Sequence, residues 1–424
     1  MSNETPEDAK VVSQWKLYKL VESLSDGKFK NASDLLNDLV TSVVNSDQFD
    51  LVGGRIWEFI PEKKAYLLRS QYGEMSKIPD GHTLKVENNP FLANVTAGRT
   101  YVNIETDEVL KESGIRMYSA TGVGDRIKSN GKKYYQYILG FNAKDATEAF
   151  YETLTIISGV ATSAIKNLAS QNEQEKIRKD IKRAAEIQAN ILPEHQYRFS
   201  DFDIYGVCIP DSKVGGDYFD YIKNEDGDEE RLGIVVGDAA SKGLPAAIQA
   251  LFVSGALRMG ASFGTKLSQL FAKLNKLVWR TFVYERFVTL CYCELHLSQN
   301  RLVLYANAGH CAPIHYRPKL DSFVHLDPTG GLLGLMENQK YSIENIRMHQ
   351  GDVLVMYTDG ITESQSRDGE QFGEERLHEL IRKYSAESAK NIALLIIEAV
   401  EKFTVESHYN DDKTIVVIKR DEQA

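Results

Sequence analysis

Four short apolar runs in the C-terminal half of the chain each meet an aspartate at one end. Such runs are typical of buried β-strands, and a carboxylate at the end of a buried strand can face a cleft. In one of them the run Gly233–Val236 leads to an aspartate, and an apolar helix is predicted shortly after it, over residues 244–259. Each aspartate by itself is also consistent with a cap on the following turn or helix. The four aspartates are Asp217, Asp238, Asp359 and Asp411.

Four carboxylates that converge on one cleft repel each other strongly unless positive charge neutralises them. Hard divalent cations do this, and oxygen ligands without clustered His or Cys select magnesium or manganese. Two such ions about 4 Å apart suit phosphoryl transfer. The pattern therefore predicts a dinuclear metal site. Asp220 lies three residues after Asp217 in a predicted strand, so only one of these two acids is expected at the site.

Two further groups of residues admit both a chemical and a structural interpretation. His310 follows a glycine at the end of a predicted strand, where it could be catalytic, but we favour a role in holding the next loop by hydrogen bonds. Cys291 and Cys293 share one face of an alternating strand. Two such ligands without a second pair make a poor zinc site, so reduced thiols are expected.

Composition restricts the class of protein. A chain of 424 residues suggests two or three domains. Its net charge of −10 argues against a nucleic-acid partner that needs a basic face. The acidic, polar start is unlike a secretory signal, and the longer apolar runs are broken by charge, which predicts no membrane span. A cytoplasmic protein is therefore expected.

The N-terminal half is organised differently. Residues 1–13 are expected to be disordered, and helices are predicted at 11–24, at 35–46 behind a cap at Asn31-Ala-Ser-Asp34, and at 146–168. Alternating runs predict a hairpin, 50–59 with 64–71, and a strand at 134–141, with a polar stretch at 72–100. Over residues 14–168 this order resembles a GAF-type sensor domain. The resemblance implies a small antiparallel sheet between helices, which either holds an unknown small ligand or serves only for dimerisation.

Residues 169–193 are dense in charged and amide side chains and predict a helical linker that ends at Leu192-Pro193. Apolar residues fit a short a/d seam, with two glutamines in the intervening positions. We therefore expect a weak two-helix coiled coil and a homodimer, with a solvated spacer as the alternative. The seam residues are Gln174, Ile177, Ile181, Ala184, Gln188 and Ile191.

At the level of motifs, residues 188–419 resemble the bacterial metal-dependent PPM (protein phosphatase 2C-like) serine/threonine phosphatases of the SpoIIE type. The matching segments follow the family order across the whole C-terminal half, which makes the match specific. They are Gln188 with Leu192-Pro193, Val214-Gly-Gly-Asp217-Tyr-Phe-Asp220, Val236-Gly-Asp238, Lys242-Gly-Leu-Pro-Ala-Ala247, Phe287-Val-Thr289, Ala306-Asn-Ala-Gly-His310, Tyr357-Thr-Asp359-Gly-Ile-Thr-Glu363, Phe372-Gly373 and Asp411-Asp-Lys-Thr414.

The resemblance implies an α+β fold, with a PPM-type β-sandwich flanked by helices over residues 194–424. It implies that Asp238 bridges two Mn²⁺ or Mg²⁺ ions, that Asp217 and the carbonyl of Ala239 bind one of them, and that Asp359 and Asp411 hold the other. Ser241 stands where the family usually has glycine. Ala240 stands where eukaryotic members carry a histidine, so no general acid is assigned.

The function implied by the resemblance is hydrolysis of a phosphoserine or phosphothreonine on a signalling protein by a metal-activated water. The family suggests a STAS-type anti-sigma-factor antagonist as the substrate, and the N-terminal domain would regulate the reaction. One alternative is a catalytically inactive, phosphatase-like binding module. A nucleotide cyclase is disfavoured, because Gly215-Gly-Asp-Tyr-Phe219 has Tyr218 where the diguanylate cyclase signature has Glu.

Overall fold

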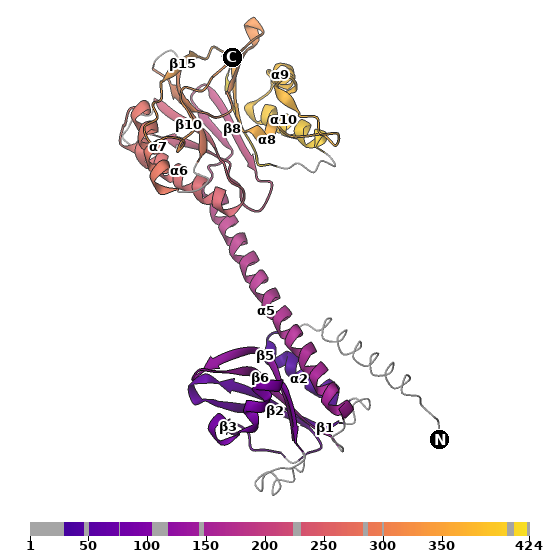
Figure 1. Cartoon of the computed structure of the whole chain (residues 1–424). Helices are drawn as coiled ribbons and strands as arrows, with labels where there is room; N and C mark the ends of the chain where they lie inside the picture. Colours follow the sequence, from indigo (N-terminus) through magenta and orange to yellow (C-terminus); the bar gives the residue numbers. More distant parts are fainter. Residues whose placement is uncertain are drawn as a thin grey trace. The chain divides into compact units, whose positions relative to one another are not determined.

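The computed structural model describes residues 29–45, 51–75, 77–103, 118–143, 148–223, 230–282, 287–298, 301–404 and 411–421. The predicted disordered start and the predicted helix at 11–24 lie outside these residues. The chain divides into two compact units, Met1–Ile177 and Arg178–Ala424 (Figure 1). Each unit is described by itself below.

The N-terminal unit is built on a six-stranded sheet in the order β3-β2-β1-β6-β5-β4. The predicted hairpin is confirmed as β1 and β2, which pair antiparallel, and the Asn31 side chain caps α2 by accepting from the Asp34 amide at 2.9 Å. The elements are α2 (Ala32–Val44), β1 (Leu51–Ile60), η1 (Pro61–Lys63), β2 (Ala65–Gly73), β3 (Thr83–Lys85), η2 (Val86–Asn88), α3 (Phe91–Gly98), β4 (Thr100–Asn103), β5 (Tyr118–Ser129), β6 (Lys132–Ala143) and α5 (Glu148–Ile191).

The two faces of this sheet are covered by different segments. One face, which includes Ile56, Leu139 and Phe141, packs against α2 and the first turns of α5. The other face carries Trp57, Tyr66 and Ile138, and packs against Leu92 and Val95 of α3. The stretch at 72–100, read from the sequence only as polar, contains β3, η2 and α3, and β4 begins at its last residue. Elements of three residues, such as β3 and η2, escape periodicity arguments because they define no period.

Helix α5 joins two predicted segments, the helix at 146–168 and the helical linker, into one helix of 44 residues. It ends at Ile191, as the Leu192-Pro193 signal predicts. The predicted seam is wrong at Gln188, which is 8% exposed. Its Nε2 donates to the Gly215 carbonyl at 2.8 Å, so Gln188 faces the core of its own unit. Ile177 and Ile187, by contrast, are more than half exposed.

The C-terminal unit is a sandwich of two antiparallel sheets, in the orders β15-β12-β11-β10-β9 and β14-β13-β16-β17-β8-β7 (Figure 1). Buried side chains of both sheets, such as Val236 and Val416, fill the space between them. The strands are β7 (Gln196–Phe199), β8 (Phe202–Ile209), β9 (Tyr218–Lys223), β10 (Arg231–Ala239), β11 (Val288–His296), β12 (Leu302–Ala308), β13 (Ile314–Arg317), β14 (Ser322–His325), β15 (Glu344–Arg347), β16 (Val353–Tyr357) and β17 (Lys413–Arg420). The predicted α+β sandwich is thus confirmed.

Helices cover the outer face of each sheet. Helices α6 and α7 pack on the first sheet, and α9 and α10 pack on the second. The helices are α6 (Leu244–Ser262), α7 (Leu267–Thr281), α8 (Asp359–Thr362), α9 (Gly373–Tyr384) and α10 (Ala389–Phe403), with a 3₁₀ turn, η3, at Pro318–Leu320. Helix α7 was not predicted, although it presents one apolar face that includes Phe271 and Leu274.

Among the described helices, α6 is long and apolar enough to cross a membrane by length and composition alone. Its small and apolar residues Ala246, Ala250, Val253 and Leu257 are buried in the core against the first sheet. These are the contacts of a core helix in a globular domain. Such a helix can have the same length and apolar content as a membrane-spanning helix.

Candidate active site

The topology brings four strand ends to one edge of the sandwich. Strands β9 and β10 are antiparallel neighbours in one sheet, so the start of β9 lies beside the end of β10. Strands β16 and β17 have the same relation in the other sheet. The predicted aspartates occupy these four ends: Asp217 precedes β9, Asp238 is the second-last residue of β10, Asp359 opens α8 just after β16, and Asp411 precedes β17.

Asp217 is the most deeply buried of the four, with 2% of its surface exposed. The Thr358 hydroxyl donates to Asp217 Oδ2 at 2.6 Å, and the same Thr358 oxygen accepts from the Thr414 amide at 3.0 Å. Burial raises the pKa of Asp217 well above its ordinary value, and the nearby Asp238 raises it further. Thr358 therefore ties a site acid of one sheet to two strand ends of the other.

Asp412 holds the glycine turn that carries Asp217. Its Oδ2 accepts from the Gly216 amide at 2.7 Å, and its Oδ1 accepts from the Asp211 amide at 2.8 Å. Two glycines make this close approach possible. A Cβ on Gly360 would lie 1.9 Å from the Asp412 carbonyl oxygen, and a Cβ on Gly216 would lie 2.9 Å from the Ala239 carbonyl oxygen. Any side chain at either position would push the strand ends apart.

The other three predicted acids, Asp238, Asp359 and Asp411, line one cleft of about 310 Å³, together with Ala239 and Asp412. Burial, followed by the charges of Asp359, Asp411 and Asp412, raises the pKa of Asp238 to about 7. Burial, followed by Glu363, also raises the pKa of Asp359. The described cleft lining contains five aspartates and a single basic residue, Lys242, whose Nζ lies 3.0 Å from Asp411 Oδ2. The cleft is thus strongly acidic.

This donor set fits hard divalent cations, because its ligand atoms are carboxylate and carbonyl oxygens and its acids are destabilised by one another. Within the residues that the structure describes, however, no set of three Asp, Glu, His or Cys side chains is already arranged to hold a metal ion. Binding of ions at Asp411 would therefore compete with its ion pair to Lys242, whose side chain is exposed.

The residues left open by the sequence have structural roles. Asp220 pairs with Arg258 of α6, whose Nη2 donates to Oδ1 at 2.9 Å, whereas Asp217 lies near Asp238. His310 is buried, and its Nδ1 lies 2.7 Å from the Thr289 hydroxyl while its amide donates to Asn307 Oδ1 at 2.8 Å. These bonds hold the loop as expected. Cys291 and Cys293 are free and fully buried between the sheets.

Sequence reasoning placed Thr358 and Asp412 in the matching motifs without assigning either a role, and it assigned Gln188 to the helical seam. For Thr358 and Asp412, the available signals were these motifs and their position beside the predicted ligands. Gln188 lies on a helix that is polar enough to be exposed to solvent, yet its side chain forms two hydrogen bonds with the Gly215 backbone. This contact depends on where the helix end lies in the fold, which the local sequence pattern does not reveal.

Comparison with known proteins agrees with this geometry. Residues 228–421 match the family model of stage II sporulation protein E (SpoIIE), a range that contains Asp238, Asp359 and Asp411. The chain is 27% identical over 248 residues to the phosphoserine phosphatase RsbU of Bacillus subtilis, covering 58% of this chain and 72% of that protein. The C-terminal unit is a PP2C-type phosphatase domain of the SpoIIE family.

Two further relatives are consistent with this assignment. The SpoIIE-type chain is 27% identical over 253 residues to protein IcfG of Synechocystis, which covers 53% of this chain and 39% of that protein. The solved SiaA-PP2C domain of Pseudomonas aeruginosa has a TM-score of 0.50 and 19% identity, covering 59% of this chain and 99% of that domain. This structure supports the fold. The GAF-like interpretation of residues 14–168 stays a prediction, as does the metal-ligand set.

Proposed function

We propose that this SpoIIE-family protein hydrolyses a phosphoserine or phosphothreonine on a signalling protein, at a site that binds two Mn²⁺ or Mg²⁺ ions. The observation that carries the proposal is the acidic cleft at the edge of the sandwich, where Asp238, Asp359 and Asp411 gather and burial and mutual repulsion raise the pKa of Asp238 to about 7. A site of this charge favours cations over a free phosphate group.

In this proposal Asp238 would hold both ions, Asp217 and the Ala239 carbonyl would hold one of them, and Asp359 and Asp411 would hold the other. When bound, the two ions would supply Lewis-acid activation of a water and offset charge on the phosphoryl group. The protein's own contribution is orientation: Thr358 fixes the Asp217 carboxylate, and Asp412 fixes the turn before it. Lys242, exposed beside Asp411, is positioned to contact phosphoryl oxygens that enter the cleft.

The substrate and the regulation are further parts of the proposal. The relative named phosphoserine phosphatase RsbU supports a phosphoserine substrate, and the family resemblance suggests a phosphorylated STAS-type protein. We also propose a cytoplasmic homodimer in which the GAF-like unit controls turnover. The exposed Ile177 and Ile187 of α5 support a helix-mediated contact between two copies.

The test is hydrolysis of p-nitrophenyl phosphate and of a phosphoserine peptide by the full chain with manganese or magnesium. We expect turnover that depends on the metal and is abolished by a chelator. Asp238→Asn should reduce turnover by about 10²-fold or more, because removing a group that organises charge in the transition state typically costs that much.

The matched control is Asp321→Asn, which changes an exposed aspartate that pairs with Arg382 outside the cleft. It should retain full turnover. A chain that binds phosphopeptide but turns over neither substrate, with no difference between Asp238→Asn and the parent, would instead establish the inactive binding module.

A further inference from the structure

The N-terminal unit contains a cavity of about 510 Å³ that the proposed phosphatase chemistry does not use. It lies against the sheet face that carries Arg55 and Trp57 of β1, with Tyr66 of β2 and Ile138 of β6. The segment from Ile78 to Leu92, which contains the edge strand β3 of the same sheet, supplies much of the remaining lining. Binding sites for small organic molecules typically have volumes of roughly 300–1,000 Å³, so the cavity is large enough for one.

Small residues on adjacent strands create this hollow. Arg55 pairs in register with Gly140 of β6, so no side chain stands directly opposite it on that strand. A Cβ at Gly140 would lie 3.0 Å from the Ser119 carbonyl oxygen, so the position tolerates little more than glycine. Ala120 on β5 extends the same shallow floor. The cavity therefore depends on the small residues Gly140 and Ala120, because larger side chains at these two positions would fill it.

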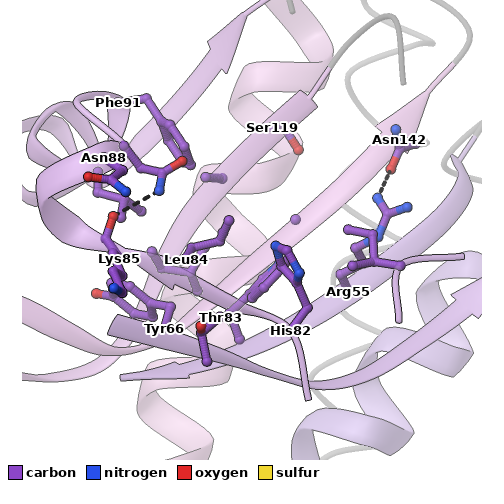
Figure 2. Close-up of a pocket in the computed structure, with 17 residues that line it drawn as sticks. Arg55, Tyr66, His82, Thr83, Leu84, Lys85, Asn88, Phe91, Ser119 and Asn142 are labelled. Carbon is purple, nitrogen blue, oxygen red and sulfur yellow. Dashed lines mark hydrogen bonds between the residues drawn. The ribbon is translucent and has the colours of Figure 1, made fainter. Parts of the chain in front are cut away.

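The electrostatic character of the cavity is positive. Arg55 is 6% exposed, and its Nη1 donates to Asn142 Oδ1 at 3.1 Å on one side of the cavity. Lys85 lies on the other side, near Asn88 and Phe91 (Figure 2). The described lining residues include no aspartate or glutamate. Such a lining favours an anionic ligand, and a planar guanidinium matches a carboxylate in shape and donor geometry.

The remaining wall is aromatic and apolar. The rings of Trp57 and His82 meet edge-on with centroids 6.3 Å apart. Tyr66 is buried, and its hydroxyl donates to the Tyr135 carbonyl at 2.8 Å. Tyr66 therefore presents ring surface to the cavity, with its polar end already bonded elsewhere. Flat aromatic surfaces of this kind bind planar ligands by stacking or edge contacts.

We propose that this cavity binds one small planar organic carboxylate, with its carboxylate at Arg55 and its ring system against Trp57 and Tyr66. A planar carboxylate is favoured over a phosphate, because the flat guanidinium matches a carboxylate in donor geometry and the aromatic walls match a planar ring. The site is separate from the acidic cleft of the phosphatase unit, so the inference stands whether or not that unit is active.

The experiment is isothermal titration calorimetry of the full chain with naphthoate and with its neutral analogue naphthamide, which has the same ring and nearly the same shape. We expect saturable binding of naphthoate, at least about tenfold tighter than naphthamide, because a hydrogen bond from a guanidinium to a carboxylate is stronger than one to a neutral amide. Arg55→Gln should remove the difference between the two probes. Ala120→Leu, which narrows the cavity and keeps the charge, should weaken both.

The matched control is Arg69→Gln, because Arg69 lies on the neighbouring strand and pairs with Glu58 outside the cavity. It should keep the preference for naphthoate. If Arg55→Gln fails to fold, as judged by circular dichroism, the exposed Lys85→Gln should still lower the preference. Absence of saturable naphthoate binding, equal affinity for the two probes, or a preference that survives Arg55→Gln would overturn the proposal.

Discussion

Thr358 shows how much of the candidate site depends on one small side chain. Its hydroxyl is fully buried, donates to Asp217 Oδ2 at 2.6 Å, and accepts from the Thr414 amide at 3.0 Å. Both partners are buried, so neither has water as an alternative. A single oxygen thus orients a proposed metal ligand and satisfies the backbone at the start of β17.

We predict that Thr358→Val, which keeps the shape but removes the hydroxyl, impairs both the site and the fold. The manganese concentration for half-maximal turnover of p-nitrophenyl phosphate should rise about 10–100-fold, as is typical when a hydrogen bond to a metal ligand is lost. The orphaned Thr414 amide and Asp217 carboxylate should also lower the free energy of unfolding by about 1–3 kcal/mol.

Thr358→Ser supplies the control, because serine restores the hydroxyl without the methyl group. It should recover most of the manganese affinity. An equal loss in the serine and valine variants would contradict the prediction, because restoring the hydroxyl would then not restore the site.

At the scale of elements, the sandwich is tied together at both ends of its strands. At one end the acids and Thr358 join β9 and β10 to β16 and β17. At the other end, Asp201 in the turn before β8 joins the two sheets. Its Oδ1 lies 2.8 Å from Nε of Arg301, which precedes β12. Its Oδ2 accepts from Nε of Arg420, at the end of β17, at 2.9 Å. Asp201 thus links strands of both sheets.

This linkage predicts an acid-dependent loss of stability. Burial acts to raise the pKa of Asp201, but hydrogen bonds from Arg301 and Arg420 outweigh it and leave the pKa below its ordinary value. A carboxylate whose folded pKa is depressed stabilises the fold above its unfolded pKa, about 3.9, and loses that contribution as pH falls through the folded value. Asp201→Asn should therefore be less stable than the parent at neutral pH, and the difference should shrink below about pH 4.

Urea unfolding of the C-terminal unit at neutral and acid pH measures this difference. Asp368→Asn, at an exposed turn position, is the reference for a change of charge outside the linkage. A stability difference between Asp201→Asn and the parent that stays constant across the pH range would show that the two arginines do not depress the pKa of Asp201.

At the scale of the whole molecule, the protein combines a cavity-bearing N-terminal unit and a SpoIIE-family phosphatase unit, whose boundary falls within α5 at Ile177 and Arg178. The C-terminal end of α5 contacts the site loop directly, because Gln188 bonds to the Gly215 backbone two residues before Asp217. A change in the helix end would therefore act on the turn that carries a proposed metal ligand.

We predict that deletion of residues 1–168 changes the turnover rate or the metal dependence of the phosphatase, because control by the N-terminal unit is lost. Sedimentation analysis of both chains would report the accompanying change in oligomeric state. A truncated chain with the same rate, the same metal dependence and the same oligomeric state would count against regulation by the N-terminal unit.

The C-terminal unit was largely predictable because its signals are local. Apolar runs of strand length, the Leu192-Pro193 stop and the proline in the first turn of α6 each report on adjacent residues, and the family motifs occur in order. The N-terminal unit was harder, because β3, η2 and α3 are too short to show a period and their positions depend on the sheet that they cover.

The sequence by itself determined that four aspartates stand at strand ends and that the C-terminal half has the motifs of a SpoIIE-type phosphatase. Only the tertiary structure decided that Asp220 pairs with Arg258 while Asp217 lies near Asp238, that Thr358 bonds to Asp217 and Asp412 to the turn before it, and that Gln188 leaves the predicted seam. It also revealed the cavity beside Arg55, whose walls come from strands far apart in the chain. The physical reason is that the periodicity of apolar residues predicts on which face of a strand or helix a residue lies. The distance between two side chains, by contrast, depends on strand pairing and on how the two sheets pack.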